Sequence, residues 1–241
     1  MHSTLLSSHS GVTVVGSANA DIVFEVERIP SPGETLLADS AARYPGGKGL
    51  NQAVAAARAG AQTAFVGAVG SDDNGEALAA AMTESGISTQ WLRRVTGESG
   101  QAFIVVDRSA ENTIIVASGA NATVTELTGE DRAQLERSAA VLMQLELPLP
   151  VVEEAARVAH YAGATVMLNA APARQLPATL LAELDLLIVN EHEALIVSGL
   201  RDLDSASALL AKRVPRLVVT LGAQGSVLYE NAVELTRVPA R

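Results

Sequence analysis

Short β-branched apolar runs alternate with alanine-rich amphipathic stretches along most of this chain, and this alternation constrains its fold more than any other feature. Residues 12–15 and 63–66 are apolar runs, and residues 51–59 and 76–85 are the amphipathic stretches that follow them. The same rhythm resumes at residues 140–145, 151–159, 165–169, 178–184, 186–189, 191–198 and 217–221. Such alternation is typical of α/β proteins. We therefore expect a doubly wound, mostly parallel sheet flanked by helices.

Two segments interrupt this rhythm. Residues 21–44 contain two prolines and a glycine between extended pieces, and residues 90–116 alternate like strands without a helix. We expect both segments to form hairpins of a small separate β layer inserted into one domain that spans residues 11–241. Residues 226–236 predict a final hairpin around a three-residue turn.

The composition excludes several classes of protein. The chain has no cysteine, which rules out disulfide scaffolds, zinc ribbons and thiolate catalysis and fits a reducing compartment. Its 17 basic and 27 acidic residues give a net charge of −10, which repels nucleic acid and anionic lipid. No stretch approaches the roughly 18 apolar residues of a membrane span, and residues 1–10 do not resemble a signal peptide. We expect a cytoplasmic protein with no nucleic-acid or membrane partner.

Polar side chains follow several of the predicted strands where those strands end. They are Asn19, Asp21, Glu146, Asn190 and Thr220. Because the carboxyl ends of parallel strands share one rim of a sheet, we expect these side chains to gather there, where open α/β sheets bind ligands. Helix capping is the alternative for each residue taken alone, since Asn, Asp and Thr commonly cap helices.

The sharpest local motif is the glycine-rich string at residues 44–53, Tyr-Pro-Gly-Gly-Lys-Gly-Leu-Asn-Gln-Ala. Three glycines in four residues before a helix let the backbone approach a ligand and aim free amides at it. The string is not a Walker A loop, because Gly49 follows Lys48 where a Ser or Thr is required. A tight helix-entry turn with a solvated lysine is the alternative interpretation.

Other motifs carry less information. Residues 222–225, Gly-Ala-Gln-Gly, are equally explained by a turn, and the acids of residues 190–193 by the dipole of a helix start. The four histidines are scattered, so we expect no zinc site. Residues 121–123, Asn-Ala-Thr, match a glycosylation sequon, which we attribute to chance because no secretion signal accompanies it.

From about residue 12 to residue 241 the chain resembles the ribokinase family of carbohydrate kinases. The segments that carry the resemblance are residues 16–21, 45–61, 142–146, 168–173, 189–193 and 220–225. Leu50 departs from the first signature, where a small residue is more usual. The resemblance implies ATP-dependent phosphorylation of D-ribose at its 5-hydroxyl, in ribose catabolism.

The same resemblance implies roles for individual residues. It places the sugar against Asn19, Ala20, Asp21, Gly47, Lys48, Gly49, Leu50, Asn51 and Glu146. It places ATP against Asn190, Thr220, Leu221, Gly222, Ala223, Gln224 and Gly225. Glu193 would help to place Mg²⁺ through water, and the family also implies K⁺, at a site outside this chain. The two insertions would form a β lid that closes over the sugar and builds a homodimer.

One family signature is missing. A Gly-Ala-Gly-Asp loop, which in the family supplies the catalytic aspartate and amides that hold the migrating phosphoryl group, does not occur in these 241 residues. The resemblance therefore predicts that the C-terminal part of the fold is absent, that no catalytic base can be named in this chain, and that phosphorylation is impaired. The alternatives are a related kinase for another pentose, a ketohexose or a nucleoside, and a non-catalytic sugar-binding chain.

Overall fold

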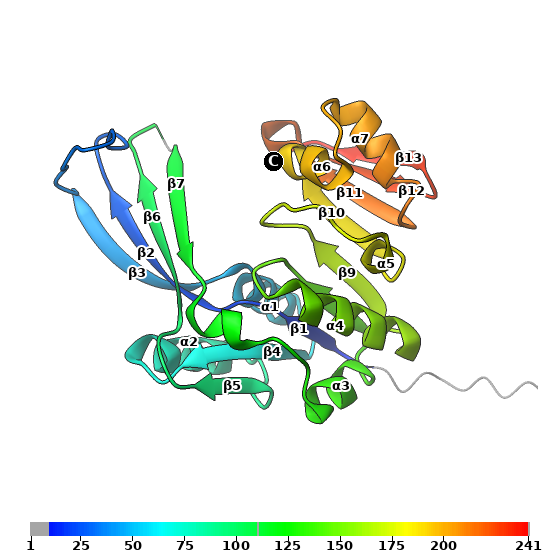
Figure 1. Ribbon diagram of the computed structural model, residues 1–241, viewed down its shortest axis with the longest axis horizontal. Helices are drawn as coiled ribbons and strands as arrows, with labels where there is room; N and C mark the ends of the chain where they lie inside the picture. The colour runs from blue at the N-terminus through cyan, green and yellow to red at the C-terminus, as the bar shows by residue number, and fades with distance from the viewer. Residues whose placement is uncertain (1–9, 110, 241) are drawn as a thin grey trace, which may run out of the picture.

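The computed structural model describes residues 10–109 and 111–240, so the expectation about residues 1–10 lies almost wholly outside the described residues. A nine-stranded sheet of order β13-β12-β11-β10-β9-β8-β1-β4-β5 forms the main layer (Figure 1). Its strands are β1 (Val12–Val15), β4 (Thr63–Gly70), β5 (Leu92–Val95), β8 (Ala140–Met143), β9 (Thr165–Asn169), β10 (Leu186–Asn190), β11 (Arg216–Thr220), β12 (Ser226–Glu230) and β13 (Val233–Val238). The β11–β12 and β12–β13 pairs are antiparallel, and the other described pairs of this sheet are parallel. The expected mostly parallel sheet is confirmed.

Helices cover both faces of the sheet. They are α1 (Lys48–Arg58), α2 (Asp73–Glu84), α3 (Gly129–Leu135), α4 (Leu149–Ala162), α5 (Ala178–Leu181), α6 (Glu191–Ser198) and α7 (Leu203–Leu210). Because neighbouring strand residues point to opposite faces, β1 contributes to two cores. Val14 packs with Leu50 of α1, and Val15 lies in the other core with Val152 of α4. This division is what a doubly wound fold requires.

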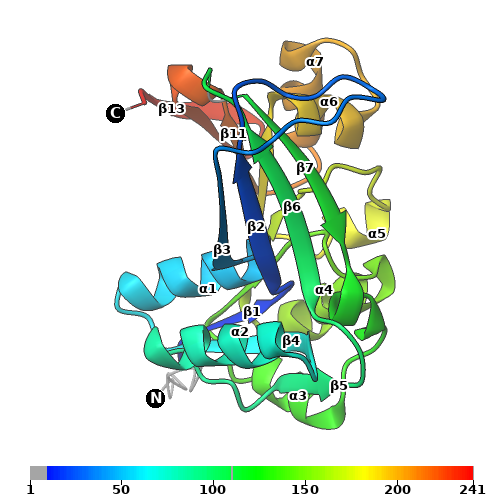
Figure 2. The same ribbon diagram turned by 90° about the vertical axis from the view of Figure 1, so that its left-hand side faces the viewer.

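A second, four-stranded sheet of order β3-β2-β6-β7 projects from the first, as Figures 1 and 2 show. We call it the small sheet; its strands are β2 (Asn19–Glu25), β3 (Ser40–Gly46), β6 (Gly100–Val106) and β7 (Asn112–Ala117). Of the predicted insertion 90–116 it contains only β6 and β7, because β5 (Leu92–Val95) pairs with β4 in the large sheet instead. Leu92 packs there beside the core formed by α1 and α2.

The C-terminal hairpin forms as predicted, by β12 and β13, but its turn has two residues instead of the predicted three, because Glu230 pairs with Val233. Asn231 and Ala232, between these strands, have positive φ angles of 49° and 65°, as a tight hairpin turn of two left-handed residues requires. On β9, β10 and β11, alternate residues are buried against the helices and the residues between them are mostly half-buried. No helix within residues 10–109 and 111–240 is long and apolar enough to cross a membrane.

The strand order fixes where a ligand can bind. From β1 the chain first builds β4 and β5 on one side, and later adds β8 to β11 on the other. The carboxyl ends of β1 and β8 therefore flank the switch point of the sheet, where ligands of open α/β folds bind. β2 begins at Asn19, four residues after β1 ends at Val15, so the small sheet rises beside this point.

Candidate functional site

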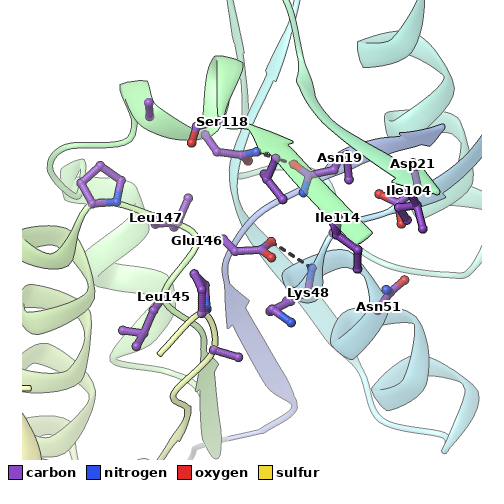
Figure 3. A pocket seen from close by; sticks show the side chains of 18 of the residues that line it. Asn19, Asp21, Lys48, Asn51, Ile104, Ile114, Ser118, Leu145, Glu146 and Leu147 are labelled. Carbon is purple, nitrogen blue, oxygen red and sulfur yellow. Dashed lines mark hydrogen bonds between the residues drawn. The ribbon is translucent and has the colours of Figure 1, made fainter. Parts of the chain in front are cut away.

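A cavity of about 770 Å³ lies at the carboxyl ends of β1 and β8, between the small sheet and α6 (Figure 3). Its lining residues are Asn19, Asp21, Gly47, Lys48, Asn51, Ala102, Ile104, Ile114, Val116, Ser118, Asn121, Ala122, Leu145, Glu146, Leu147, Pro148, Ala171, Pro172 and Glu193. The sequence analysis predicted seven of these as site residues, namely Asn19, Asp21, Gly47, Lys48, Asn51, Glu146 and Glu193. The structure thus gathers residues from distant parts of the chain at one place.

The glycine-rich string forms the start of α1, so the helix-entry interpretation describes its conformation correctly. It also lines the cavity through Gly47 and Lys48. Gly46 is required for packing: a Cβ atom built there would lie 2.0 Å from Oδ2 of Asp21. The string therefore does two things at once, because it opens the helix and makes room for the Asp21 carboxylate.

Glu146 is held in place by hydrogen bonds to one of its two carboxylate oxygens. The Ser17 hydroxyl and the backbone N–H of Lys48, at 3.2 Å, both donate to Oε2. The Ser17 hydroxyl in turn accepts a hydrogen bond from the backbone N–H of Gly49. Ser17 is fully buried and was not predicted as a functional residue. The only signal that could have found it is its place inside the motif at residues 16–21.

Asp21 is the second carboxylate of the cavity, and its pKa is raised above the ordinary 3.8 by burial and by the negative charge of Glu146. Its Oδ1 atom is buried and has no hydrogen-bond partner among the described residues. A buried carboxylate oxygen without a donor is costly. A ligand that brings hydroxyl donors would relieve that cost, so this corner of the cavity suits a polyol.

The small sheet also gives the cavity an apolar wall. Ile104 of β6 and Ile114 of β7 line the cavity, together with Ala102 and Val116 (Figure 3). No aromatic side chain occurs among the described lining residues. A cavity lined by carboxylates and amides together with aliphatic carbons matches a small ligand that has both hydroxyls and C–H groups.

Asn121 is a lining residue that sequence reasoning missed. It lies in the 3-10 helix η1 (Gly119–Thr123) directly after β7, and its side chain contacts Ala18 and Asn19 through hydrogen bonds. The sequence marked this residue only as part of a sequon. No local pattern shows that Asn121 meets a residue 102 positions earlier in the chain.

The predicted nucleotide residues lie together, but outside this cavity. Asn190 and Thr220 are register partners at the ends of β10 and β11, and residues 221–225 form a turn that contains the 3-10 helix η2 (Gly222–Gln224). The Asn190 side chain caps α6 by accepting from the Glu193 backbone N–H at 2.8 Å, as the capping interpretation expected. Glu193, whose backbone N–H is capped by Asn190, connects this group to the cavity.

Glu193 belongs to both regions. Its Oε2 atom accepts a hydrogen bond from the Asn190 backbone N–H at 2.8 Å, and the residue lines the cavity. The described residues contain no cluster of three or more acidic or histidine side chains that could hold a metal ion. Oε1 of Glu193 takes no part in the capping bond. A single carboxylate oxygen fits a Mg²⁺ ion that is held mainly by phosphates and water.

Three predicted sugar-site residues do not line the cavity. Leu50 is 1% exposed and packs in the core with Val14, and Ala20 is buried in β2. Gly49 acts through its backbone N–H, which donates to Ser17. These residues support the site without lining the cavity. A motif segment contains packing positions as well as positions that contact a ligand.

Comparisons with known proteins find relatives of this chain in sequence and in structure. Residues 10–241 match the family described as pfkB family carbohydrate kinase. The ribokinase of Haemophilus influenzae is 44% identical over 222 residues, which cover 89% of this chain and 72% of that protein. The Bacillus subtilis ribokinase is 38% identical over 231 residues, covering 95% and 77% respectively. The structure of Arabidopsis thaliana ribokinase complexed with ribose and ATP superposes with a TM-score of 0.86 at 31% identity, covering 96% of this chain and 78% of that one.

Proposed function

This chain belongs to the pfkB family of carbohydrate kinases, and from that premise we propose that it phosphorylates D-ribose with ATP, in a reaction impaired by the missing Gly-Ala-Gly-Asp loop. The observation that carries the proposal is the cavity at the switch point, in which Asp21 and Glu146 lie beside an aliphatic wall. Two carboxylates there accept hydrogen bonds from hydroxyls, and the wall takes up the C–H groups of the ring. A pentose has both kinds of group.

Each residue of the sugar site offers the ligand a different hydrogen-bonding group. The partnerless Oδ1 of Asp21 accepts a sugar hydroxyl, and the Oε1 atom of Glu146 accepts another, since Ser17 and Lys48 already occupy Oε2. Asn51, in the second turn of α1, offers a further amide to the same ligand. Together these groups orient the sugar, and orientation supplies much of the rate in phosphoryl transfer.

The small sheet acts as a lid in this proposal. Ile104 and Ile114 already form one wall of the cavity, so closure of the small sheet over the sugar would exclude water from the transfer. The same sheet exposes Ile115, which is 66% exposed, and Tyr44, which is 56% exposed. These apolar side chains support a homodimer formed through the lid, which light scattering with and without an Ile115→Lys substitution would test.

ATP would bind along the rim formed by Asn190 and residues 220–225, next to the sugar. Glu193 would help to hold Mg²⁺, which when bound neutralises charge on the phosphates. K⁺ is part of the proposal through the family alone. Assays should therefore contain ATP, Mg²⁺ and K⁺, with omission of each cation in turn.

The test combines binding with turnover. Calorimetry with D-ribose measures the sugar site, and ADP release with and without D-ribose measures the reaction. Ribose-dependent ADP release supports the proposal, whereas binding without turnover would support a non-catalytic sugar-binding chain. Tighter binding of another sugar in a panel of pentoses, ketohexoses and nucleosides would overturn the choice of D-ribose. The cavity gives a nucleobase no described aromatic side chain to stack on, so we expect nucleosides to bind weakly.

A further inference from the structure

The side-chain orientation of Asn121 is fixed by the backbone of a single residue, Ala18. The Ala18 N–H donates to Oδ1 of Asn121 at 3.0 Å, and Nδ2 of Asn121 donates to the Ala18 carbonyl at 3.2 Å. A backbone N–H can only donate and a carbonyl can only accept. The oxygen and the nitrogen of the Asn121 amide therefore cannot be exchanged without losing both hydrogen bonds.

This orientation determines which end of Asn19 faces the cavity. The second hydrogen on Nδ2 of Asn121 is donated to Oδ1 of Asn19 at 2.8 Å. The oxygen of Asn19 is thereby occupied, and its Nδ2 lies on the other side of the amide (Figure 3). Within the described part of the chain no hydrogen bond involves that nitrogen. Asn19 lines the cavity, so it offers the ligand a donor.

Packing keeps the two amides in contact. Asn19 is 2% exposed and Asn121 is 1% exposed. A Cβ atom on Gly100, at the start of β6, would lie 2.2 Å from both Nδ2 of Asn121 and Oδ1 of Asn19, so this position has room for hydrogen only. Asn121 also follows directly after the small sheet, in η1. The contact therefore links the end of β7 to the start of β2.

We propose that Asn121 is a positioning residue that fixes Asn19 as a hydrogen-bond donor to one sugar hydroxyl. The inference rests on the proposed function, because it takes the ligand of the cavity to be a sugar. It makes the site selective for a ligand with an acceptor oxygen at that place, and it makes this selectivity depend on a residue outside the predicted sugar-binding motifs. The neighbouring residues Asp21 and Glu146 offer acceptors to the sugar, and Asn19 offers the complementary donor.

An Asn121→Asp substitution tests this at mildly alkaline pH, where the new carboxylate is ionised. The carboxylate can still accept from Ala18 but cannot donate to Oδ1 of Asn19, so Asn19 must turn its amide over and present its oxygen to the cavity. We expect the Kd for D-ribose in calorimetry to rise roughly 10-fold, because the lost donor is replaced by an acceptor. The matched control is Thr123→Ala, in the same helix η1, where the side chain bonds only to the Ala120 carbonyl.

A panel of deoxy sugars separates positioning from general damage. The wild-type chain should discriminate D-ribose from the one deoxyribose that lacks the contacted hydroxyl, and Asn121→Asp should abolish that discrimination alone. Any effect of Thr123→Ala on binding should be the same for every sugar. The same result in Asn121→Asp, with all sugars bound more weakly by one factor, would overturn the inference. Should Asn121→Asp fail to fold, Asn121→Ala takes its place, because it removes the donor without adding a charge.

A second readout does not need a sugar. In protein labelled with ¹⁵N at asparagine, the side-chain amide signal of Asn19, assigned by its loss in Asn19→Asp, should shift in Asn121→Asp and stay in place in Thr123→Ala. An unmoved Asn19 signal would overturn the inference. Absence of D-ribose binding to the wild-type chain, with the Asn19 signal shifting as expected, would instead overturn the proposed sugar while the positioning role stands.

Discussion

The backbone N–H of Lys48 donates a hydrogen bond to Oε2 of Glu146, and the two atoms are 3.2 Å apart. This contact joins the first turn of α1 to the turn after β8, across 98 positions of sequence. Ser17 donates to the same oxygen from the turn after β1. One carboxylate oxygen thus ties together three loops at the switch point of the sheet, and the predictions below depend on this arrangement.

Removal of the Ser17 hydroxyl should weaken sugar binding more than it weakens the fold. We expect Ser17→Ala to raise the Kd for D-ribose about fivefold, because Glu146 loses a charge-assisted hydrogen bond worth about 1 kcal/mol or more. Calorimetry measures the change. Ser138→Ala is the matched control, since Ser138 is also fully buried but bonds to Thr13 away from the cavity. An equal Kd in both variants would contradict the role given to Ser17.

Asp21 should strengthen sugar binding without stabilising the folded protein at neutral pH. Because its folded pKa lies above 3.8, its stabilising contribution is complete below that pH and is lost as the pH rises through the folded pKa. We therefore expect Asp21→Asn to be at least as stable as wild type towards urea at neutral pH, while its Kd for D-ribose rises roughly 10- to 100-fold. A less stable variant with unchanged affinity would show that Asp21 is a structural residue.

The pH at which sugar binding weakens should depend on the negative charge of Glu146. We expect the affinity for D-ribose to fall on acidification at a pH above the ordinary Asp value of 3.8, as Asp21 becomes protonated. In Glu146→Gln the neighbouring charge is gone, which leaves burial alone to raise the pKa of Asp21. The midpoint of the fall should therefore move to lower pH. A midpoint that does not move between the two proteins would mean that the carboxylates do not interact.

A methyl group at Gly46 should displace the Asp21 carboxylate. The added Cβ would lie 2.0 Å from Oδ2 of Asp21, so Gly46→Ala must push this side chain out of position. We expect at least a 10-fold rise in the Kd for D-ribose, by calorimetry, if Asp21 contributes a charged hydrogen bond. Gly129→Ala is the control, because a Cβ there meets nothing within 4 Å. Wild-type affinity in Gly46→Ala would place the sugar away from Asp21.

Asp72 should stabilise the junction between α2 and the small sheet. It caps α2 by accepting from Gly75 at 2.8 Å, and it accepts from both the backbone N–H and the hydroxyl of Ser99, next to β6. Burial raises the pKa of Asp72, but the hydrogen bonds from Ser99 and Gly75 outweigh it and lower the pKa below 3.8. Its stabilising contribution is therefore present above pH 3.8 and is lost as the pH falls through the folded pKa.

The Asp72 contribution can be separated from ordinary helix capping. We expect Asp72→Ala to lower the free energy of unfolding in urea by about 2 kcal/mol at neutral pH, and by less in acid. Asp202→Ala is the matched variant, because Asp202 caps α7 through Ser205 alone and should cost about 1 kcal/mol. Equal losses in the two variants would show that the bonds to Ser99 add nothing.

The sequence by itself determined the sheet and seven of the residues that line the cavity. Strands such as β1 and β4 follow from their apolar runs, since burial on both faces requires them, and Glu146 was predictable because it comes three residues after β8. β5 was misplaced into the small sheet, because a strand's local pattern does not state which neighbour it will pair with. The tertiary structure made that choice by packing Leu92 beside α1 and α2.

Only the tertiary structure revealed the partners of the polar site residues. Ser17 and Gly46 lie inside motifs, but no sequence pattern shows what Ser17, Gly46 or Asn121 contacts, because each acts through a residue that is distant in the chain or through a close approach of atoms. The hydrogen bond from Asn121 to Asn19 spans 102 positions, and it exists only once β6 has paired with β2 and β7 has folded back along β6. Local periodicity fixes which side chains are buried, whereas the direction in which a buried amide points is decided by the backbone groups that the fold brings to it.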